Sequence, residues 1–486
     1  MPFSKNPTIQ TYETKQIKLV QEWETRDKSG TKDNDTVNCF YEIVRNKKTG
    51  ENDHYVISRN GTTVYPTTTL ASYLIRGIYY VKALDYLYVA VDASVKVFQG
   101  ATGVELATIN TGFGFTFSEV GFTEFNYDIG VIKLIVTNGT VLGTIDSTHN
   151  FVVCTSPTLP VPHLPYPVFM DGYLFVTKKG TADIYNSNLN DPLTWPAGSF
   201  ISSEILPDNL LRISRLNNYI VAFGSSSIEY FWDAGNPTAS PLQRNDTPVK
   251  LVGYRGGLTH WGNKIFFVGD TDSTTAEVFM IEDFKIESLG KPPIRRLVES
   301  SPIIYGTVVS FSGHDFYVLT VNAFTYMVDL ETKLWTRLKY KQNGNMPIAY
   351  STVVPINNTG CCVFYNTAQL RLDYFNPDVY YDDGVEFNPT VITDNEYFDS
   401  YNNKFCNRLT VVADRPSTDT SAYVDVSWTD DDFQSFSTPR RVALNQELPA
   451  LTALGKFRRR AHKIVHTGSA RFRLLSLEVN INKGIR

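Results

Sequence analysis

Short apolar segments recur in pairs from residue 77 onward, and a turn separates the two members of each pair. The segments are rich in Val, Ile, Tyr and Phe, which favour strands, and Gly, Asn, Asp and Ser fill the turns. The pattern therefore predicts a succession of β-hairpins. The predicted strands are residues 79–84 with 87–91 and 95–98, 131–136 with 141–145 and 151–154, 173–177 with 182–185, 219–223 with 228–231, 264–268 with 277–281, 315–321 with 325–329, and 361–365 with 370–374.

The hairpins follow one another at a spacing of roughly 40 to 50 residues, the period of four-stranded propeller blades. A single blade cannot bury both of its faces, but blades packed around an axis can, and only short strand edges then stay open. We therefore predict an all-β chain with a β-propeller of six or seven blades. Two successive β-sandwiches are the alternative.

The character of the chain changes at both ends of this repeat. Residues 1–66 are polar and uneven, which indicates a partly extended N-terminal arm that can supply a strand to close the propeller. The acidic, Gly-ended stretch 378–384 marks the end of the propeller, predicted over 67–384. Beyond it, apolar and polar residues alternate as in one-sided antiparallel strands. A C-terminal antiparallel β-sandwich is therefore predicted over 385–486, with strands at 408–413, 422–429, 461–466 and 471–479.

Composition supports a mostly β chain and limits its partners. Aromatic residues make up 13% of the sequence, and rings pack well on pleated surfaces. The formal net charge of −5 provides no overall basic field, so we do not expect general DNA binding, and any genomic DNA that passes the protein should do so without sequence-specific binding. The five cysteines lack the spacing of a zinc or redox site and are interpreted as reduced core residues. With no signal peptide and no apolar span, we expect a soluble product without a membrane anchor.

The sequence offers few candidate catalytic or metal-binding residues. The sequence contains no His-Glu-x-x-His, phosphate-loop or Gly-x-Ser-x-Gly motif, so we predict no catalytic residue, cofactor or metal. The serines 225–227 are interpreted as a turn. Three consecutive carboxylates, Asp430, Asp431 and Asp432, favour a hairpin turn over a calcium site, because calcium loops alternate their oxygen ligands and need a glycine for the bend. Calcium remains the alternative there.

One basic patch stands out near the C-terminus. If it forms a strand, Arg458 and Arg460 lie on one side and Arg459 on the other. We interpret the patch as a subunit interface or a solvated strand, with DNA contact as the alternative. Its residues are Arg458, Arg459, Arg460, Lys463, Arg471 and Arg473.

Three segments carry a family likeness. The first is a strand, turn and strand formed by Phe223, Gly224, Ser225, Ser226, Ser227, Ile228, Glu229, Tyr230 and Phe231. With residues 428–441 and the closing strand at 471–474, this hairpin resembles signatures of the packaged-DNA stabilisation proteins. These are the tail-nozzle, or head-completion, components of short-tailed bacteriophages.

The resemblance implies a structural virion protein of the tail, assembled in the host cytoplasm, and no enzyme. About six copies would form a ring below the portal and its adaptor, extend the DNA channel, retain packaged DNA until ejection, and anchor tailspikes or fibres. A plug or needle protein would seal the exit.

Two other functions stay open. A propeller that binds or hydrolyses glycans would have a deep axial pocket with converging carboxylates or stacked aromatic rings. A cellular scaffold propeller that binds peptides is the third possibility.

Overall fold

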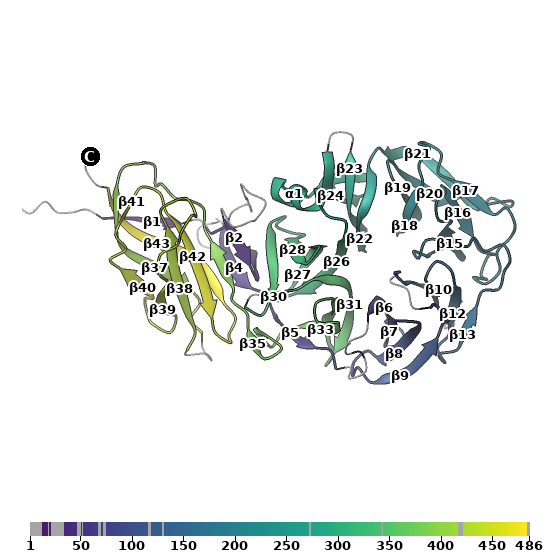
Figure 1. The fold of residues 1–486 in the computed structure, drawn as a ribbon, viewed down its shortest axis with the longest axis horizontal. Helices are drawn as coiled ribbons and strands as arrows, with labels where there is room; N and C mark the ends of the chain where they lie inside the picture. The colour runs from purple at the N-terminus through teal and green to yellow at the C-terminus, as the bar shows by residue number, and fades with distance from the viewer. Residues whose placement is uncertain are drawn as a thin grey trace, which may run out of the picture.

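The computed structural model describes residues 12–17, 19–20, 34–45, 50, 52–66, 70, 74–114, 118–128, 131–271, 274–342, 344–416 and 421–483. Within these residues the chain is almost entirely β, with one α-helix, α1 (Pro292–Glu299). No helix in this part of the chain is long and hydrophobic enough to cross a bilayer. A ring of sheets lies beside a smaller unit that contains the C-terminal strands (Figure 1).

The blades of the ring each have four antiparallel strands, which follow one another along the chain in every blade but that of β31–β33. Among the described residues, five blades are separate sheets: β6–β9 (Ile75–Val81, Tyr86–Val91, Ser94–Gln99, Glu105–Asn110), β10–β13 (Gly121–Asp128, Val131–Thr137, Leu142–Ile145, Phe151–Val153), β14–β17 (Val168–Met170, Tyr173–Thr177, Asp183–Asn186, Phe200–Ser202), β18–β21 (Leu210–Leu216, Tyr219–Gly224, Ile228–Asp233, Leu242–Lys250) and β22–β25 (Gly253–Trp261, Lys264–Thr271, Thr274–Glu282, Lys285–Ser288). The blade β26–β29 (Ile304–Phe311, His314–Val321, Phe324–Asp329, Trp335–Tyr340) is part of a ten-stranded sheet, and β31–β33 (Ile348–Ile356, Thr359–Asn366, Arg371–Asn376) are part of a six-stranded one.

The middle strands of the blades supply most of the propeller core. Phe223 on β19, for example, is fully buried and meets Phe267 of the next blade edge to face, with ring centroids 5.3 Å apart. Most of the predicted strands lie on these middle strands, while 79–84 and 151–154 fall on the first and last strands of their blades, β6 and β13, and the prediction of a β-propeller with six or seven blades is confirmed. The predicted strand 79–84 is wrong at its end, because β6 stops at Val81 and Asp85 adopts a left-handed turn conformation.

The N-terminal part of the chain completes the ring. Strand β5 (Gly61–Val64) pairs antiparallel with β33, so that Val64 lies opposite Asp373. The blade that contains β33 thereby gains its fourth strand from a segment about 300 residues away. On its other side this blade packs against the β6–β9 blade, and Leu87 and Val363 share one core.

The smaller unit consists of two sheets that enclose one core. The first contains β3 (Cys39–Arg45), β4 (Asn52–Ser58), β43 (Arg473–Lys483), β37 (Lys404–Ala413) and β40 (Ala450–Thr452), with β1 (Glu13–Ile17) and β41 (Lys456–Phe457) at its margins. The second contains β36 (Thr390–Ile392), β42 (Ala461–Thr467), β38 (Tyr423–Thr429) and β39 (Arg440–Ala443), and continues through β2 (Asp35–Val37) into β29 of the propeller. Short pairs at β30 (Gly344–Asn345) and at β34 (Tyr381–Asp382) with β35 (Val385–Glu386) complete the sheets.

These sheets differ from the separate C-terminal sandwich that we expected. Leu477 of the first sheet and Ile464 of the second do share a core. However, both sheets take strands from the N-terminal arm, and one of them runs on into a blade. The alternation of residues 408–479 identifies strands but cannot reveal partners more than 300 residues away in the sequence.

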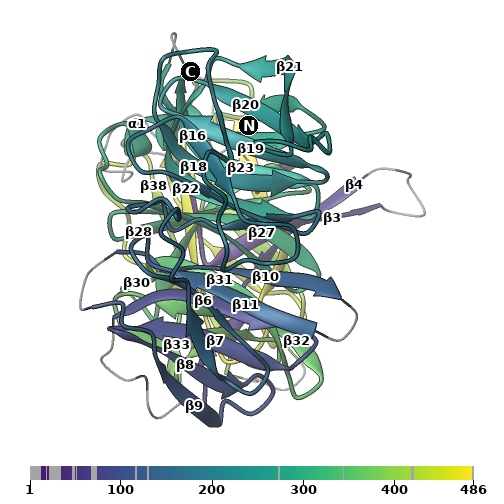
Figure 2. The same cartoon turned by 90° about the vertical axis from the view of Figure 1, so that its right-hand side faces the viewer.

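The hairpin of β3 and β4 lies between the two units at its base. Tyr41 packs into the core of the smaller unit, whereas Phe40 and Ile57, on the opposite face, pack into the propeller core. Figure 2 shows both strands extending outward beyond the blades. The hairpin base therefore fixes the two units to each other.

Candidate functional site

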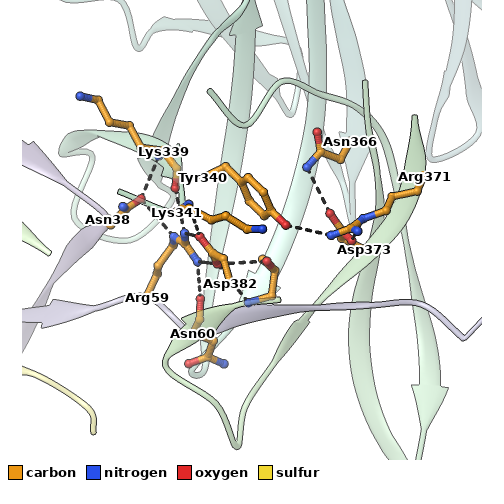
Figure 3. Close-up of polar contacts among 11 residues, drawn as sticks. Asn38, Arg59, Asn60, Lys339, Tyr340, Lys341, Asn366, Arg371, Asp373 and Asp382 are labelled. Atoms are coloured by element: carbon orange, nitrogen blue, oxygen red, sulfur yellow. Dashed lines mark hydrogen bonds and ion pairs between the residues drawn. The ribbon is translucent and has the colours of Figure 1, made fainter. Parts of the chain in front are cut away.

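A buried ion pair between Arg59 and Asp382 lies where the propeller meets the smaller unit (Figure 3). Arg59 Nη2 and Nη1 donate to Asp382 Oδ2 and Oδ1 at 2.6 and 2.9 Å, and both side chains are 0% exposed. The guanidinium also stacks over the Phe387 ring, 3.9 Å from its centroid. Such a two-pronged pair fixes direction as well as distance.

The remaining donors of Arg59 reach three separate segments. Nε donates to Asn38 Oδ1 at 3.1 Å, Nη1 to the Asn60 carbonyl at 2.8 Å, and Nη2 to the Lys339 carbonyl at 2.8 Å. Asn38 follows β2, and Lys339 belongs to β29 of the propeller. One side chain thus joins the N-terminal arm to a blade.

Asp382 is equally well satisfied. Its Oδ1 accepts from the backbone N–H and the hydroxyl of Thr62, at 3.2 and 3.0 Å, and its Oδ2 accepts from the Lys341 N–H at 2.8 Å. A buried charge pair is stable only when its remaining polar atoms are also bonded, and removing one partner is then costly. The junction can therefore hold a fixed arrangement of segments, because the charged groups of both side chains are engaged within the described residues.

A second polar cluster lies beside this junction. Arg371 Nε donates to Asp373 Oδ1 at 2.8 Å, and its Nη2 donates to the Tyr340 hydroxyl at 2.8 Å. Asn366 Nδ2 donates to the other Asp373 oxygen at 3.1 Å. Burial raises the pKa of Asp373 to about 6, although the positive charge of Arg371 opposes the shift. This cluster binds the end of β33 to the end of β29.

The propeller axis contains the main cavity. Its central part, about 640 Å³, is lined mainly by the innermost strands of several blades. A part of about 780 Å³ adjoins it and shares Ile78, Tyr79, Thr259 and His260 with it. A third part, of about 240 Å³, adjoins the central part elsewhere. Five residues line both the central and the 240 Å³ part, and we call them the waist: Glu119, Tyr166, Arg212, Leu258 and Tyr350.

Tyr166 organises the charged groups of the waist. The Arg212 guanidinium lies over its ring, 4.1 Å from the centroid, and the Tyr166 hydroxyl donates to Glu119 Oε2 at 2.7 Å. Arg212 Nη1 also donates to the Tyr254 hydroxyl at 3.4 Å. Burial and the nearby Glu119 charge raise the pKa of the Tyr166 hydroxyl, which therefore remains a hydrogen-bond donor at neutral pH. The waist presents a fixed positive and a fixed negative group to the cavity.

The signature hairpin lies on β19 and β20. Ser226 and Ser227 donate their backbone N–H groups to Asp208 Oδ2 at 2.7 and 3.1 Å, so the serines form a turn fixed by a carboxylate. Glu229 is fully buried and accepts from the Ser203 hydroxyl at 2.5 Å and from the Ile205 N–H at 3.1 Å. Asp208, in the loop before β18, and Glu229, on β20, therefore bind that loop to the blade.

The basic patch is divided by the structure. Residues 458–459 form a bend between β41 and β42 rather than a strand, so the expected alternation is wrong: Arg458 is exposed, whereas Arg460 is 1% exposed. Arg460 donates to both oxygens of Asp430, at 2.7 and 2.8 Å, and lies over the Phe457 ring. Arg460 is thus committed to an ion pair inside the chain.

The other basic residues lie near the surface. The Lys463 ammonium is 5.6 Å from the Phe436 ring centroid, and Arg471 is exposed. Arg473 forms ion pairs with Glu42 at 3.7 Å and Asp414 at 3.5 Å. Arg459 forms an ion pair with Asp432 at 3.7 Å. Arg459, Arg460 and Arg473 of the patch are therefore engaged in ion pairs within the chain.

The three consecutive carboxylates have three different partners. Asp430 binds Arg460, and Asp432 Oδ1 accepts from Asn395 Nδ2 at 3.0 Å. Asp431 accepts from Ser435, whose hydrogen bonds lower the pKa of this carboxyl below its usual range. In the described part of the chain no group of three or more His, Cys, Asp or Glu side chains is arranged to hold a metal ion.

Sequence reasoning did not identify the residues of the junction or of the waist. Asp382 lies in the acidic stretch that was interpreted as a boundary, but its partner Arg59 is 323 positions away. Arg212 and Glu119 lie on different blades and have no local motif. Only their shared place on the propeller axis brings them together.

The chain is similar to a known protein family and to several solved structures. A family model described as "Bacteriophage P22 Gp10, beta-propeller" matches residues 105–380, more than half of the chain. The comparison with curated proteins found no match.

Similar solved structures include a streptogramin B lyase, at 10% identity and a TM-score of 0.45, covering 65% of this chain and 98% of that one. The N-terminal domain of Nup159 has 10% identity and a TM-score of 0.40, covering 70% and 98%. A virginiamycin B lyase from Staphylococcus aureus has 10% identity and a TM-score of 0.44, covering 64% and 98%.

Proposed function

The chain belongs to the bacteriophage P22 Gp10 β-propeller family of phage DNA-stabilisation proteins, which are structural proteins, and on that premise we propose that it is a nozzle subunit of a short phage tail. About six copies form a ring below the portal and its adaptor. The ring extends the DNA channel, retains packaged DNA until ejection, and anchors tailspikes or fibres, while a plug or needle protein seals the exit. The family match over residues 105–380 is the observation that carries this proposal.

The physical character of the chain supports such a role. A conduit for DNA under pressure should not bind phosphate, and the net charge of −5 favours a channel surface that repels it. A wall must also resist deformation, which closed β-sheets with paired backbone groups do well. The fully bonded Arg59–Asp382 pair suits a subunit whose two units must keep one orientation.

We also propose roles for the parts of the chain. The C-terminal region (385–486), together with the strands β1, β3 and β4 of the N-terminal arm (1–66), provides contacts between subunits, and the propeller (67–384), completed by β5 of the arm, forms the wall. Within the basic patch, Arg458, Arg459, Lys463, Arg471 and Arg473 keep part of their surface exposed and form a subunit interface or contact passing DNA, whereas Arg460 is buried. The signature hairpin, residues 223–231, has a structural role in its blade.

Mass measurement and negative-stain imaging test the nozzle. The purified chain, mixed with a portal–adaptor complex from a short-tailed phage, should add about six copies and appear as a ring at the distal end. A chain that stays monomeric and never joins the complex would contradict the proposal. The surface potential of an assembled ring tests the channel separately, and a continuous Lys/Arg stripe along the bore would contradict a DNA-repelling wall.

A further inference from the structure

The waist of the axial cavity retains hydrogen-bonding capacity that the nozzle role does not use. Among the described residues, Arg212 has one hydrogen bond, to Tyr254 at the long distance of 3.4 Å. Glu119 Oε2 accepts a hydrogen bond from the Tyr166 hydroxyl, and Glu119 Oε1 has no hydrogen-bond partner among the described residues. The cavity therefore contains a charged donor and a charged acceptor that are both still available.

The donor and the acceptor are held in place by one rigid side chain. The Tyr166 ring lies under Arg212 and the Tyr166 hydroxyl binds Glu119, so the two charges keep a fixed separation. Tyr350 supplies a further wall and is itself stacked on Tyr365, with centroids 6.4 Å apart and an interplanar angle of 9°. Such preorganisation lowers the entropy cost of binding.

Aromatic side chains beyond the waist also line the central part of the cavity. Tyr79 and Phe122, which both line it, stack with centroids 6.2 Å apart and an interplanar angle of 28°. The Tyr79 hydroxyl donates to Glu124 Oε1 at 3.4 Å. Flat apolar surfaces thus lie beside polar groups, and a volume of about 640 Å³ is typical of a small-molecule site.

We propose that the axial cavity binds a saccharide. A sugar hydroxyl is both a donor and an acceptor, so neighbouring hydroxyls can donate to Glu119 and accept from Arg212 while the C–H face of the sugar ring lies on an aromatic side chain. Phosphate-rich ligands are disfavoured by Glu119 and Glu124, and a fully apolar ligand would leave both charges buried without partners. The site binds and breaks no bond, and it does not depend on the nozzle assembly.

A glycan microarray of bacterial-surface and plant oligosaccharides, probed with the full chain, tests this site. Isothermal titration with the strongest array ligand then compares wild type with Arg212→Gln and Glu119→Gln. The matched control is Arg441→Gln, which removes an arginine that also lies over a tyrosine ring, Tyr423, and pairs with a carboxylate, Asp425, but lies in the smaller unit.

The expected result is binding by wild type, a loss of about tenfold or more in affinity for both waist variants, and unchanged affinity for the control. Tyr166→Phe keeps the ring and removes only the hydroxyl that orients Glu119, so it should weaken binding without unfolding the chain. The proposal is overturned if wild type retains no glycan on the array, or if the waist variants bind as wild type does. Ring formation with the portal–adaptor complex is a separate readout, so the two proposals can fail independently.

Discussion

Two buried polar residues close together in the smaller unit differ in whether their side chains are paired. Arg460 has a carboxylate partner, whereas His462, two residues along on β42, is 1% exposed and neither of its ring nitrogens has a hydrogen bond to the described residues. Burial, together with the Arg460 charge, lowers the pKa of His462 to about 3. The folded chain therefore keeps this imidazole neutral at pH values above about 3.

The lowered pKa of buried His462 predicts that the folded chain loses stability as the pH falls. Its unfolded pKa is near 6.5, so between pH 6.5 and about 3 the unfolded chain binds a proton that the folded chain does not. The free energy of unfolding should fall for wild type relative to His462→Leu by roughly 2 to 3 kcal/mol between pH 7 and pH 4.5. Urea unfolding of both proteins at several pH values measures this difference. A difference that does not change with pH would contradict the assignment.

At the level of elements, close approach of β5 to β34 limits what can occupy position 61. A Cβ placed on Gly61 would collide with the backbone oxygen of Tyr381, which cannot move without breaking the strand pairing. Gly61→Ala should therefore lower the free energy of unfolding by about 1 to 3 kcal/mol and the melting temperature by several degrees. Gly360→Ala, in β32 of the same sheet, is the control, because its new methyl group would meet only Val353 at an ordinary 3.5 Å. Equal melting temperatures for the two variants would show that β5 does not close the blade tightly.

The same elements show what the sequence could and could not predict. Middle strands such as β19 are continuous apolar runs, so their pairing with β20 is a local pattern. The innermost strand β22 contains three glycines and two breaks in register with β23, and these interrupt any regular apolar period. Strand β5 was expected only as a possible contribution of the arm, because four residues do not specify a partner 300 positions away. The waist was unpredictable for the same reason, since its residues meet only when the ring closes.

At the scale of the whole molecule, the Arg59–Asp382 pair should make the propeller and the smaller unit unfold together. Arg59→Met leaves the Asp382 carboxylate buried without a counterion, and Asp382→Asn leaves the Arg59 guanidinium buried without one. Each substitution should therefore lower the free energy of unfolding by about 3 to 5 kcal/mol. The double variant should lose less than the sum, because neither charge is then left alone. Arg441→Gln, which breaks a largely exposed pair, should cost less than about 1 kcal/mol.

Scanning calorimetry separates this coupling from a simple loss of stability. Wild type should show one transition, and the single variants should show two, because β2 and β5 no longer hold the arm, the blades and the second sheet in one cooperative structure. Losses that add in the double variant, with one transition throughout, would mean that the hairpin base of β3 and β4 alone couples the two units. The junction would then be a local ion pair, and the orientation of the units in an assembled ring would depend on the packing of Tyr41 and Phe40.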